Sequence, residues 1–407
     1  MPRLVKRIVI AGSLLTGAVL RAQGPIPFER VAPGVGYARV EQAAGPWVAH
    51  IVRVDRAAGP WTVVARHAGD SVRSRETTSA IAARDAARPR AAGSGEVLGA
   101  LNADFFDLRT GEVTDHQVID GAVWKAIPGF PVRNGRWRSR GQFAIAEDGT
   151  PVIGRLRYVG TATAGRRAFA LDGVNGIPRE GAALIHFDAR WGVLPVADST
   201  RAVTADTVVQ GIRLVAYDGA GRARLDSLVA AVRRRWRPDA RVRLAHRFEA
   251  GDPLRGRDAT ARARPDTPET PDTSAVGPGA PTVLRPTTLV GGWGILVRGG
   301  HDVSARTESI ERTAPSLSAQ RHPRSVIGTS DGGRILWLIA VDGRQTASVG
   351  MTFAELATLL RELGVEEGLN LDGGGSTALW VAGAVRNRPS DPTGERAVGN
   401  ALLVVRR

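Results

Sequence analysis

The stretch RILWLIAVDGRQTASVGMTFAELATLLRELGVEEGLNLDGGGSTALW, residues 334–380, contains the pattern that decides the fold. It begins with a continuous apolar run, which has the length of a strand in the interior of a sheet. Thr352 and Glu355 then form the Thr-x-x-Glu capping box of a helix, apolar residues follow at helical spacing, and Gly364 ends the helix. A second apolar run follows. The stretch therefore predicts a strand, a helix and a strand.

Two carboxylates stand at the ends of the two predicted strands. Asp342 follows the first strand and Asp372 follows the second, and each is followed by glycine. Carboxyl ends of strands connected in this way meet at one edge of a sheet, so we expect the two carboxylates to share a crevice. The three glycines after Asp372 allow a ligand to approach the main chain, and their N–H groups suit an anion. A glycine-rich turn without a ligand is the alternative interpretation.

Short apolar runs separated by glycine and proline fill the rest of the chain. Residues 31–65 predict two strands of a meander, residues 78–87 a short helix, and residues 97–106 a buried strand. Further short strands are expected within residues 141–242, among them one in residues 213–225. The predicted fold class is α+β, with a mixed β-sheet core of many short strands and a few peripheral helices, including the C-terminal strand-helix-strand unit.

The net charge of the 407-residue chain is +15, and only two of its 55 basic residues are lysines. The arginines are scattered along the chain, which favours a codon bias or an anionic substrate. Because there is no basic helix and no aromatic platform, we predict that the protein does not bind nucleic acid. The chain contains no cysteine, so its stability must come from packing rather than from disulfides.

Residues 1–24 have the outline of a secretory signal peptide. Arg3, Lys6 and Arg7 precede an apolar run that is short for a membrane span, and small residues follow it. Arg21 stands near the cleavage position, so an uncleaved N-terminal anchor is the alternative. We therefore predict a secreted or periplasmic protein, with no later segment that spans a membrane.

Three further polar clusters accompany the apolar runs. Asn102 and Asp104 stand at the end of a predicted strand, and Arg324 stands just before another. Asn387 and Arg396 belong to a polar loop near the C-terminus. Each cluster in isolation also fits a capped turn, a surface ion pair or an ordinary loop, so their significance depends on their occurring together.

Together these motifs resemble the phosphodiester glycosidase family. The resemblance covers roughly residues 95–406, and the motifs that carry it occur in this order: N-A-D-F-F (102–106), I-D-G (119–121), V-G-G-W-G (290–294), P-R-S-V-I-G (323–328), V-D-G-R-Q (341–345), L-N-L-D-G-G-G-S-T (369–377) and R-N-R-P-S-D (386–391). Because matches lie on both sides of the Pro-rich stretch of residues 251–286, we predict that this stretch is an insertion in one domain of residues 96–407. A strand-rich segment, residues 25–95, precedes that domain.

The resemblance implies an enzyme that hydrolyses sugar 1-phosphodiesters at the glycosidic bond and releases a sugar and a phosphomonoester. Phosphate is a good leaving group, so the groups that hold it matter more than acid assistance. Arg324 is the first candidate for a bidentate phosphate contact, and Arg344 is the second. The other expected substrate-binding residues are Gly373, Gly374, Gly375, Ser376, Asn387 and Arg396. The expected catalytic residues are Asp372, Asp342, Asp104 and Asn102.

A metal ion and a non-catalytic role remain as alternatives at this point. Asp104, Asp342 and Asp372 offer oxygen ligands for calcium or magnesium, although their spacing does not require a metal, and the absence of histidine or cysteine clusters argues against zinc. The expected partner is a phosphorylated sugar or glycan of the bacterial envelope or outside the cell. The alternative function is a cell-surface module of the same fold that binds carbohydrate or polyanions. The sequence leaves the sugar, the stereochemical outcome and the oligomeric state open.

Overall fold

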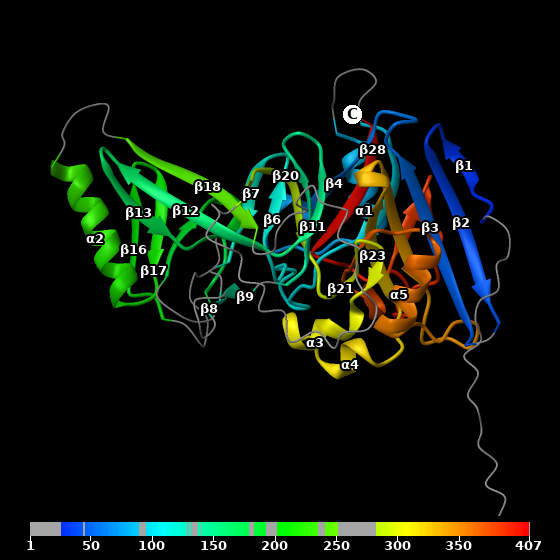
Figure 1. Ribbon diagram of the computed structural model, residues 1–407. Helices are drawn as coiled ribbons and strands as arrows, with labels where there is room; N and C mark the ends of the chain where they lie inside the picture. Colours follow the sequence, from blue (N-terminus) through cyan, green and yellow to red (C-terminus); the bar gives the residue numbers. More distant parts are fainter. Residues whose placement is uncertain are drawn as a thin grey trace, which may run out of the picture.

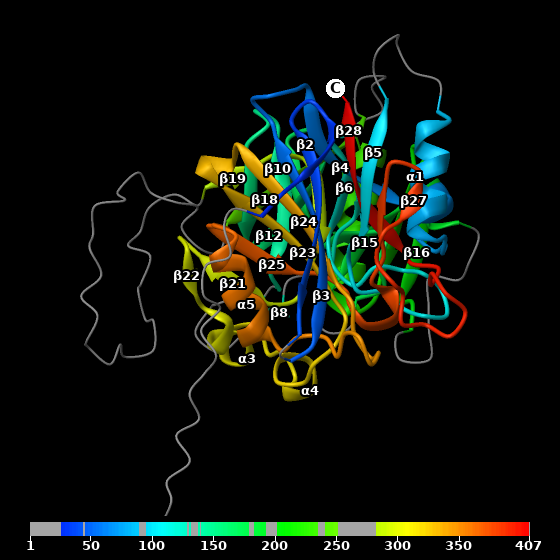
Figure 2. The same ribbon diagram turned by 90° about the vertical axis from the view of Figure 1, so that its right-hand side faces the viewer.

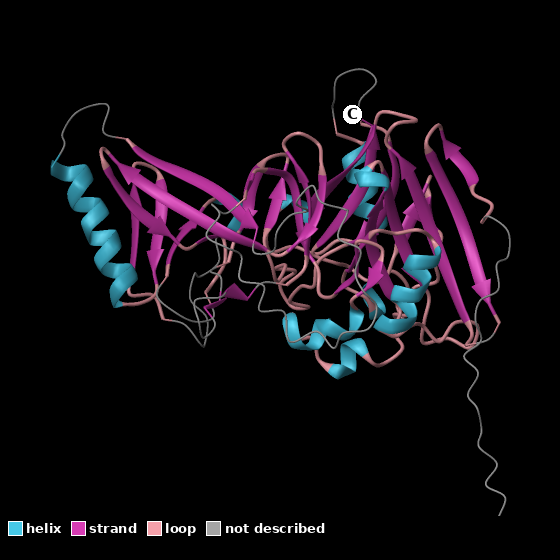
Figure 3. Ribbon diagram, viewed as in Figure 1, coloured by secondary structure: helices cyan, strands magenta, loops and turns pink. Residues whose placement is uncertain are grey.

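The structure is a computed structural model that describes residues 26–43, 45–88, 95–127, 130–131, 137–138, 140–178, 183–192, 202–234, 241–250 and 282–406. The predicted signal peptide and residues 251–281 of the predicted insertion lie outside these residues. Strands dominate and the helices lie at the periphery (Figure 3), which confirms the predicted α+β class. The helices are α1 (Thr78–Ala86), α2 (Gly219–Arg234), α3 (Thr307–Ile310), α4 (Pro315–Ser318) and α5 (Phe353–Glu362). None of the helices in this part of the chain is long and apolar enough to cross a membrane.

The main sheet has eight antiparallel strands drawn from both ends of the chain. Their order is β1 (Glu29–Ala32), β2 (Val35–Gln42), β3 (Trp47–Asp55), β24 (Ile335–Val341), β23 (Arg324–Ser330), β25 (Glu367–Asn370), β21 (Ile295–Arg298) and β22 (His301–Asp302). Every residue of β24 is buried, as its continuous apolar sequence predicts. Because β23 lies between β24 and β25 and is antiparallel to both, β24 and β25 run in the same direction.

Two five-stranded sheets complete the main body. One has the order β27 (Ala384–Val385), β26 (Leu379–Val381), β5 (Val97–Asn102), β28 (Asn400–Arg406) and β4 (Trp61–His67). The other has the order β11 (Pro151–Gly154), β10 (Gln142–Ala146), β20 (Pro286–Gly291), β6 (Gln117–Ile119) and β7 (Ala122–Lys125). The strands β8 (Phe130–Pro131) and β9 (Trp137–Arg138) pair with each other.

The core of the main body lies between these three sheets. Its largest apolar cluster combines Leu338 of the main sheet, Leu402 of β28 and Phe143 of β10, all fully buried. A second cluster packs α5 onto the other face of the main sheet, and a third packs α1 onto the sheet that contains β28. The two helices therefore cover outer faces of the body and lie on opposite sides of the strands in Figure 2.

The helix α5 begins as its sequence predicts. Thr352 Oγ1 accepts the Glu355 N–H at 3.2 Å, and the Glu355 carboxylate accepts the Thr352 N–H at 2.9 Å. This reciprocal pair satisfies N–H groups that the first turn of a helix leaves without partners. The predicted strand-helix-strand unit is thus β24, α5 and β25, with β23 inserted between the two strands in the sheet.

A lobe formed by consecutive residues extends away from the main body at the end that carries α2 (Figure 1). One of its sheets has the order β13 (Arg167–Leu171), β12 (Leu156–Ala164), β18 (Val242–Ala250) and β19 (Val283–Leu284). The other has the order β14 (Gly173–Val174), β15 (Leu184–Phe187), β17 (Ile212–Ala216) and β16 (Ala205–Val209). The ends that flank the predicted insertion are neighbours, because β18 pairs with β19.

Two predictions about local structure are wrong. The two strands expected as a meander, β3 and β4, lie in different sheets, because β3 pairs with β24 and β4 pairs with β28. The strand expected in residues 213–225 ends early, and α2 begins there instead. Asp218 Oδ1 accepts the Gly221 N–H at 2.6 Å, so the Asp-Gly pair that suggests a hairpin turn starts a helix.

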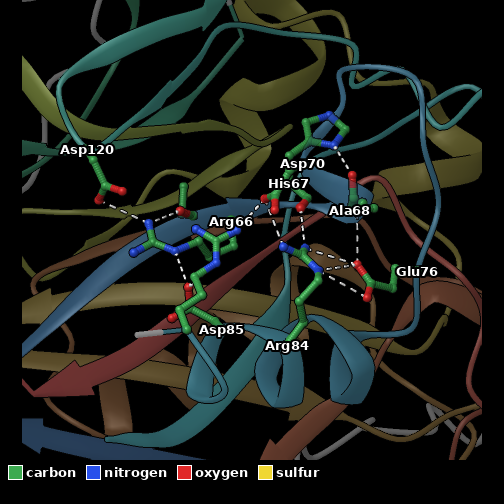
Figure 4. A network of polar contacts seen from close by, with 11 residues as sticks. Arg66, His67, Ala68, Asp70, Glu76, Arg84, Asp85 and Asp120 are labelled. Carbon is green, nitrogen blue, oxygen red and sulfur yellow. Dashed lines mark hydrogen bonds and ion pairs between the residues drawn. The ribbon is translucent and has the colours of Figure 1, made fainter. Parts of the chain in front are cut away.

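A network of ion pairs attaches α1 to its sheet (Figure 4). Arg66 of β4 donates through Nε to Asp85 Oδ1 of α1 at 2.6 Å and through Nη1 to Asp120 Oδ1 at 3.1 Å. Arg66 is 6% exposed and Asp85 is fully buried. Nearby, Arg84 donates to both carboxylate oxygens of Glu76. The Arg66–Asp85 contact is therefore a buried ion pair that joins helix and sheet.

We expect Asp85→Ala to lower the free energy of unfolding by about 3–5 kcal/mol, because it leaves the Arg66 guanidinium buried without this partner. Urea denaturation measures the change. Asp226→Ala is the matched control, because it removes an aspartate that forms an exposed pair with Arg222, also on a helix, and it should change stability little. Equal losses in the two variants would contradict the role assigned to the buried pair.

Candidate functional site

Asp372 lies just beyond β25, at the edge of the main sheet where β23 begins. Its N–H donates to Ala103 O at 2.8 Å, and this bond joins the end of β25 to the segment that follows β5. The carboxylate is half-buried and accepts the Gly373 N–H at 3.0 Å. Burial raises the pKa of Asp372 to about 6, and Ser376, Gly373 and Arg396 limit that rise. Asp372 therefore changes its charge not far below neutral pH.

Asp104 directly follows the residue that accepts this bond, and it is only 2% exposed. Its two oxygens accept hydrogen bonds from Thr114 Oγ1 (3.4 Å) and the Asp115 N–H (3.1 Å). Burial, and then the neighbouring Asp115 carboxylate, raise the pKa of Asp104 to about 8. Asp104 therefore keeps its proton at neutral pH, whereas most of the Asp372 population has lost it. Two carboxyls with separated pKa values are the usual basis of acid–base chemistry, and the Asp372–Ala103 bond joins the segments that carry these two.

Asn102 connects the strands around the two carboxyls. Its Nδ2 donates to Asp372 O at 2.7 Å, and its Oδ1 accepts from Ser325 Oγ at 2.6 Å and from the Ala378 N–H at 3.1 Å. The side chain is fully buried. Asn102 therefore positions Asp372, and the prediction that Asn102 is itself catalytic needs correction.

Asp342 lies at the same edge of the sheet as Asp372, at the end of β24, but β23 separates them. Two strand spacings amount to roughly 10 Å. Asp342 is 6% exposed, and its oxygens face the Arg388 N–H (2.9 Å) and His50 Nε2 (3.4 Å). Protein groups thus occupy both oxygens. Asp342 supports the loop that contains Arg388, and the catalytic role predicted for it stays a prediction.

Arg324, the first candidate for binding phosphate, is 1% exposed. Its Nε donates to Met351 O at 2.8 Å, and its Nη2 donates to Leu317 O (2.7 Å) and Gln320 O (2.8 Å). Its guanidinium carbon lies 4.7 Å from the centre of the Phe353 ring, and burial lowers its pKa to about 10. The guanidinium therefore joins loops beneath α5. The prediction that it binds phosphate is wrong, because binding would require these bonds to break.

Two of the three glycine N–H groups also form hydrogen bonds within the protein. The Gly373 N–H donates to Asp372, and the Gly374 N–H donates to Pro323 O at 2.9 Å. A Cβ at Gly373 would overlap Pro323 O, and Gly374 has a φ of +62°, so glycine is required at both positions. The predicted anion grip by three amides is therefore wrong for Gly373 and Gly374.

Two arginines lie against the glycine loop. Arg344 is exposed, and its Nη2 would lie 3.1 Å from a Cβ at Gly374. Arg396 is partly exposed, packs against Gly375, and donates through Nε to Asp391 Oδ2 at 2.7 Å. Arg396 also lowers the pKa of Asp372. The structure thus places both predicted ligands against the glycine loop, and Arg396 also near the Asp372 carboxylate.

The side chain of Asn387, in contrast, forms hydrogen bonds within the protein. Its Oδ1 accepts the Leu379 N–H at 2.7 Å and its Nδ2 donates to Thr377 O at 3.0 Å. The side chain is 6% exposed. It holds the loop after β27 against the segment before β26, and the prediction that Asn387 binds substrate is wrong.

Buried polar atoms without a hydrogen-bond partner in the described protein gather near Asp372. They are Thr377 Oγ1, Asn370 Oδ1 and Asn400 Nδ2. The Oδ1 atom of Asn400 accepts the Asp104 N–H at 2.8 Å, so this residue touches the second carboxyl as well. Buried polar groups are nearly always paired, and such groups indicate a place for a ligand or ordered water.

Sequence reasoning missed Arg140 and Trp293. Arg140 Nη1 donates to Thr114 Oγ1 at 2.9 Å, and the same hydroxyl contacts Asp104. The Arg140 guanidinium carbon lies 3.8 Å from the centre of the Trp293 ring, and Phe105 meets that ring edge-on at 5.6 Å. Trp293 belongs to the motif V-G-G-W-G, which could have marked it as a candidate site residue. No sequence motif marks Arg140, because its contacts with Thr114 and Trp293 depend on the tertiary fold.

In the part of the chain that the structure describes, no three or more His, Asp or Glu side chains converge as metal ligands would. The divalent cation therefore stays an untested prediction. A groove of about 650 Å³ opens elsewhere, between β1, β2 and α5, and its lining includes Phe28, Arg53 and Trp337. None of the predicted site residues lines it, so the pair Asp104 and Asp372 defines the candidate site.

Residues 249–405 match the sequence model of the family "Phosphodiester glycosidase". Over these residues, which are less than half of the chain, the sequence is similar to that family. The resemblance predicted from the motifs is thereby confirmed for this part, which contains Asp372 and the arginines beside it but not Asp104. The SPbeta prophage-derived uncharacterized protein YomE of Bacillus subtilis is 38% identical over 84 residues, which are 21% of this chain and 13% of that protein.

Two solved structures share the fold of this chain. A hypothetical protein from Synechocystis superposes with a TM-score of 0.62 and 17% identity, over 95% of this chain and 64% of that one. A Burkholderia pseudomallei protein, named as a candidate exported protein, superposes with a TM-score of 0.61 and 21% identity, over 88% of this chain and 74% of that one. For the catalytic domain of zebrafish N-acetylglucosamine-1-phosphodiester alpha-N-acetylglucosaminidase the TM-score is 0.45 and the identity 16%, over 92% and 84%.

Proposed function

We propose that this protein hydrolyses sugar 1-phosphodiesters at the bond between C1 and the bridging oxygen. The observation that carries the proposal is the hydrogen bond from the Asp372 N–H to Ala103 O, which joins the segments of two carboxyls, Asp104 with a pKa of about 8 and Asp372 with a pKa of about 6. At neutral pH the pair offers one proton donor and one carboxylate. The family match over residues 249–405 supports a glycosidase-type hydrolase.

The reaction adds one water molecule to the substrate. The C1–O bond breaks, the phosphate leaves with the bridging oxygen, and the oxygen of water becomes bonded to C1. Asp104 donates a hydrogen bond or its proton to the leaving phosphate. Asp372 stabilises the positive charge that develops at C1, and either accepts a proton from water or attacks C1 itself. The configuration of the released sugar, followed by NMR, distinguishes these two roles of Asp372.

Opposite sides of Asp372 suit the two halves of such a substrate. The Trp293 N–H donates to Asn370 O at 2.9 Å, so the Trp293–Phe105 pair lies on the β21 side of β25. Arg344 and Arg396 lie on the side of the glycine loop. We assign the sugar ring to the aromatic side, where apolar sugar faces pack well, and the phosphate to the arginine side.

Export is part of the proposal. The signal-like outline of residues 1–24 supports it, and one protein of the same fold is named as a candidate exported protein. A C-terminal tag, detected with an antibody in separated medium, periplasm and cytoplasm, tests whether the protein is exported. Retention of all the protein in the cytoplasm would contradict this part.

The activity itself is tested with simple substrates. Purified protein is incubated with aryl or alkyl sugar 1-phosphates of several sugars, and released sugar and phosphomonoester are quantified. We expect equal amounts of the two products. Release of neither product, together with calorimetric binding of an anionic glycan, would favour the non-catalytic binding module instead.

A further inference from the structure

A row of arginines continues from the glycine loop along the edge of the site. Arg344 and Arg388 are exposed, and Arg396 packs on Gly375. Among the ion pairs of the described residues, only Arg396 of these three has an acidic partner, Asp391. The edge therefore carries an excess of positive charge that the fold does not neutralise, which favours an anion.

Arg344 is held in a strained and specific position. Its φ of +59° lies in the left-handed region, which costs free energy in a residue other than glycine. Its Nη2 lies 3.3 Å from His322 Nδ1, and His322 Nε2 lies 2.9 Å from Ser316 O. A carbonyl only accepts, so Nε2 is the donor and Nδ1 accepts from Arg344. Burial and the nearby guanidiniums lower the pKa of His322, so it stays a neutral acceptor. Such strain commonly marks functional positions.

Arg388 is fixed beside Arg344 by its backbone. The Arg388 N–H donates to Asp342 Oδ1 at 2.9 Å, and its carbonyl accepts from Gln345 Nε2 at 2.8 Å. Both partners lie within two residues of Arg344 in the sequence, so these two bonds join the two loops. The Arg388 side chain is exposed. The hydroxyl of Ser390, two residues on, is buried without a partner in the described protein.

We propose that Arg344 and Arg388 bind a second phosphate in the leaving group of the substrate. The inference rests on the proposed function, and it names the substrate class: sugars linked through C1 to a leaving group with two or more phosphates. The first phosphate, next to C1, lies at Arg396 and Gly375. The second lies between Arg344 and Arg388, where a forked guanidinium contact is available from each side. A diphosphate and a chain of phosphodiesters share this chemistry.

The test compares two substrates with the same sugar, a methyl sugar 1-phosphate and a nucleoside diphosphate sugar. We expect the second to have the larger kcat/KM. Arg344→Gln and Arg388→Gln should each reduce that preference by about tenfold, the usual weight of one guanidinium–phosphate contact. Arg386→Gln is the matched control, because Arg386 donates to Val381 O and lies over the Tyr37 ring, and it should leave the preference unchanged. An equal preference in all four proteins would overturn the inference.

Calorimetry separates this inference from the proposed function and identifies the source of the second phosphate. Inorganic phosphate, pyrophosphate and a glycerol phosphate oligomer are titrated into the wild type and the two variants. Tighter binding of pyrophosphate than of phosphate, lost in Arg344→Gln, supports the second site even if no substrate is hydrolysed. Preferential binding of the oligomer indicates repeated phosphodiesters. Equal binding of phosphate and both larger anions overturns the inference, whatever the fate of the activity.

Discussion

Replacing Asp372 by asparagine is expected to lower kcat/KM for a sugar 1-phosphodiester by about 1,000-fold, which corresponds to about 4 kcal/mol of transition-state stabilisation. Asparagine keeps the size of the side chain and an oxygen for the Gly373 N–H, but it has no charge to stabilise C1 and no basic oxygen. The expected loss lies mainly in kcat, because the interaction belongs to the transition state. Initial rates over a range of substrate concentrations measure it.

The matched control is Asp331→Asn. Asp331 also follows a strand of the main sheet and precedes two glycines, but it stands at the end of β23, at the opposite edge, with 60% of its side chain exposed. We expect this variant to keep wild-type kinetics. A rate for Asp372→Asn within threefold of the wild-type rate would remove Asp372 from the chemistry, and with it the proposed site.

The second large effect concerns the pH dependence of the reaction. Activity requires Asp372 without a proton and Asp104 with one, so kcat/KM should rise as the pH passes about 6 and fall as it passes about 8. Asp104→Asn cannot ionise. We expect it to lose the alkaline fall and to reduce the rate at pH 7 by about 100-fold, because the amide is a poor proton donor. A profile from pH 4 to pH 10 measures both limbs.

The same variant separates a role in catalysis from a role in folding. The pKa of Asp104 is about 8 in the folded protein, whereas an unfolded aspartate titrates near 4. Between these values the folded state binds more protons than the unfolded state, so stability falls as the pH rises. Asp104→Asn removes this penalty and should be more stable than the wild type at pH 8, with a smaller difference at pH 4. A variant that is inactive and also unstable at pH 8 would contradict this account.

The segments that the sequence predicts well are those governed by local rules. A capping box at Thr352 depends on residues three apart, and a run such as residues 335–341 needs burial on both faces wherever it lies. The position of Asp372 at a strand end followed from the same pattern, and the structure adds the hydrogen bond from Asp372 to Ala103, the residue before Asp104. Contacts between residues that lie far apart in the sequence could not be predicted from such local patterns.

The arginines illustrate that limit. Arg324 and Arg396 are alike in sequence terms, each near a recognised motif, yet Arg324 is enclosed by carbonyl groups under α5 whereas Arg396 lies beside Asp372. The difference depends on where α5 packs over Arg324, the first residue of β23, and on how the loop before β28 brings Arg396 against Gly375. A single sequence without that tertiary arrangement cannot separate a guanidinium that holds loops together from one that meets a ligand.

The pairing of chain ends in the main body has a consequence for the order of assembly. β3 can pair with β24 only after some 280 further residues have been synthesised. β4 can pair with β28, which ends at Arg406, only when synthesis is nearly complete. The lobe between β11 and β20 is contiguous and draws on near neighbours, so its contacts form over shorter loops. During synthesis from the N-terminus, the strands of the lobe and their pairing partners are therefore complete before β24 and β28 are made. The main sheet, which precedes Asp372, can close only when β25 becomes available, and the sheet of β5, which precedes Asp104, only when β28, the last strand, does.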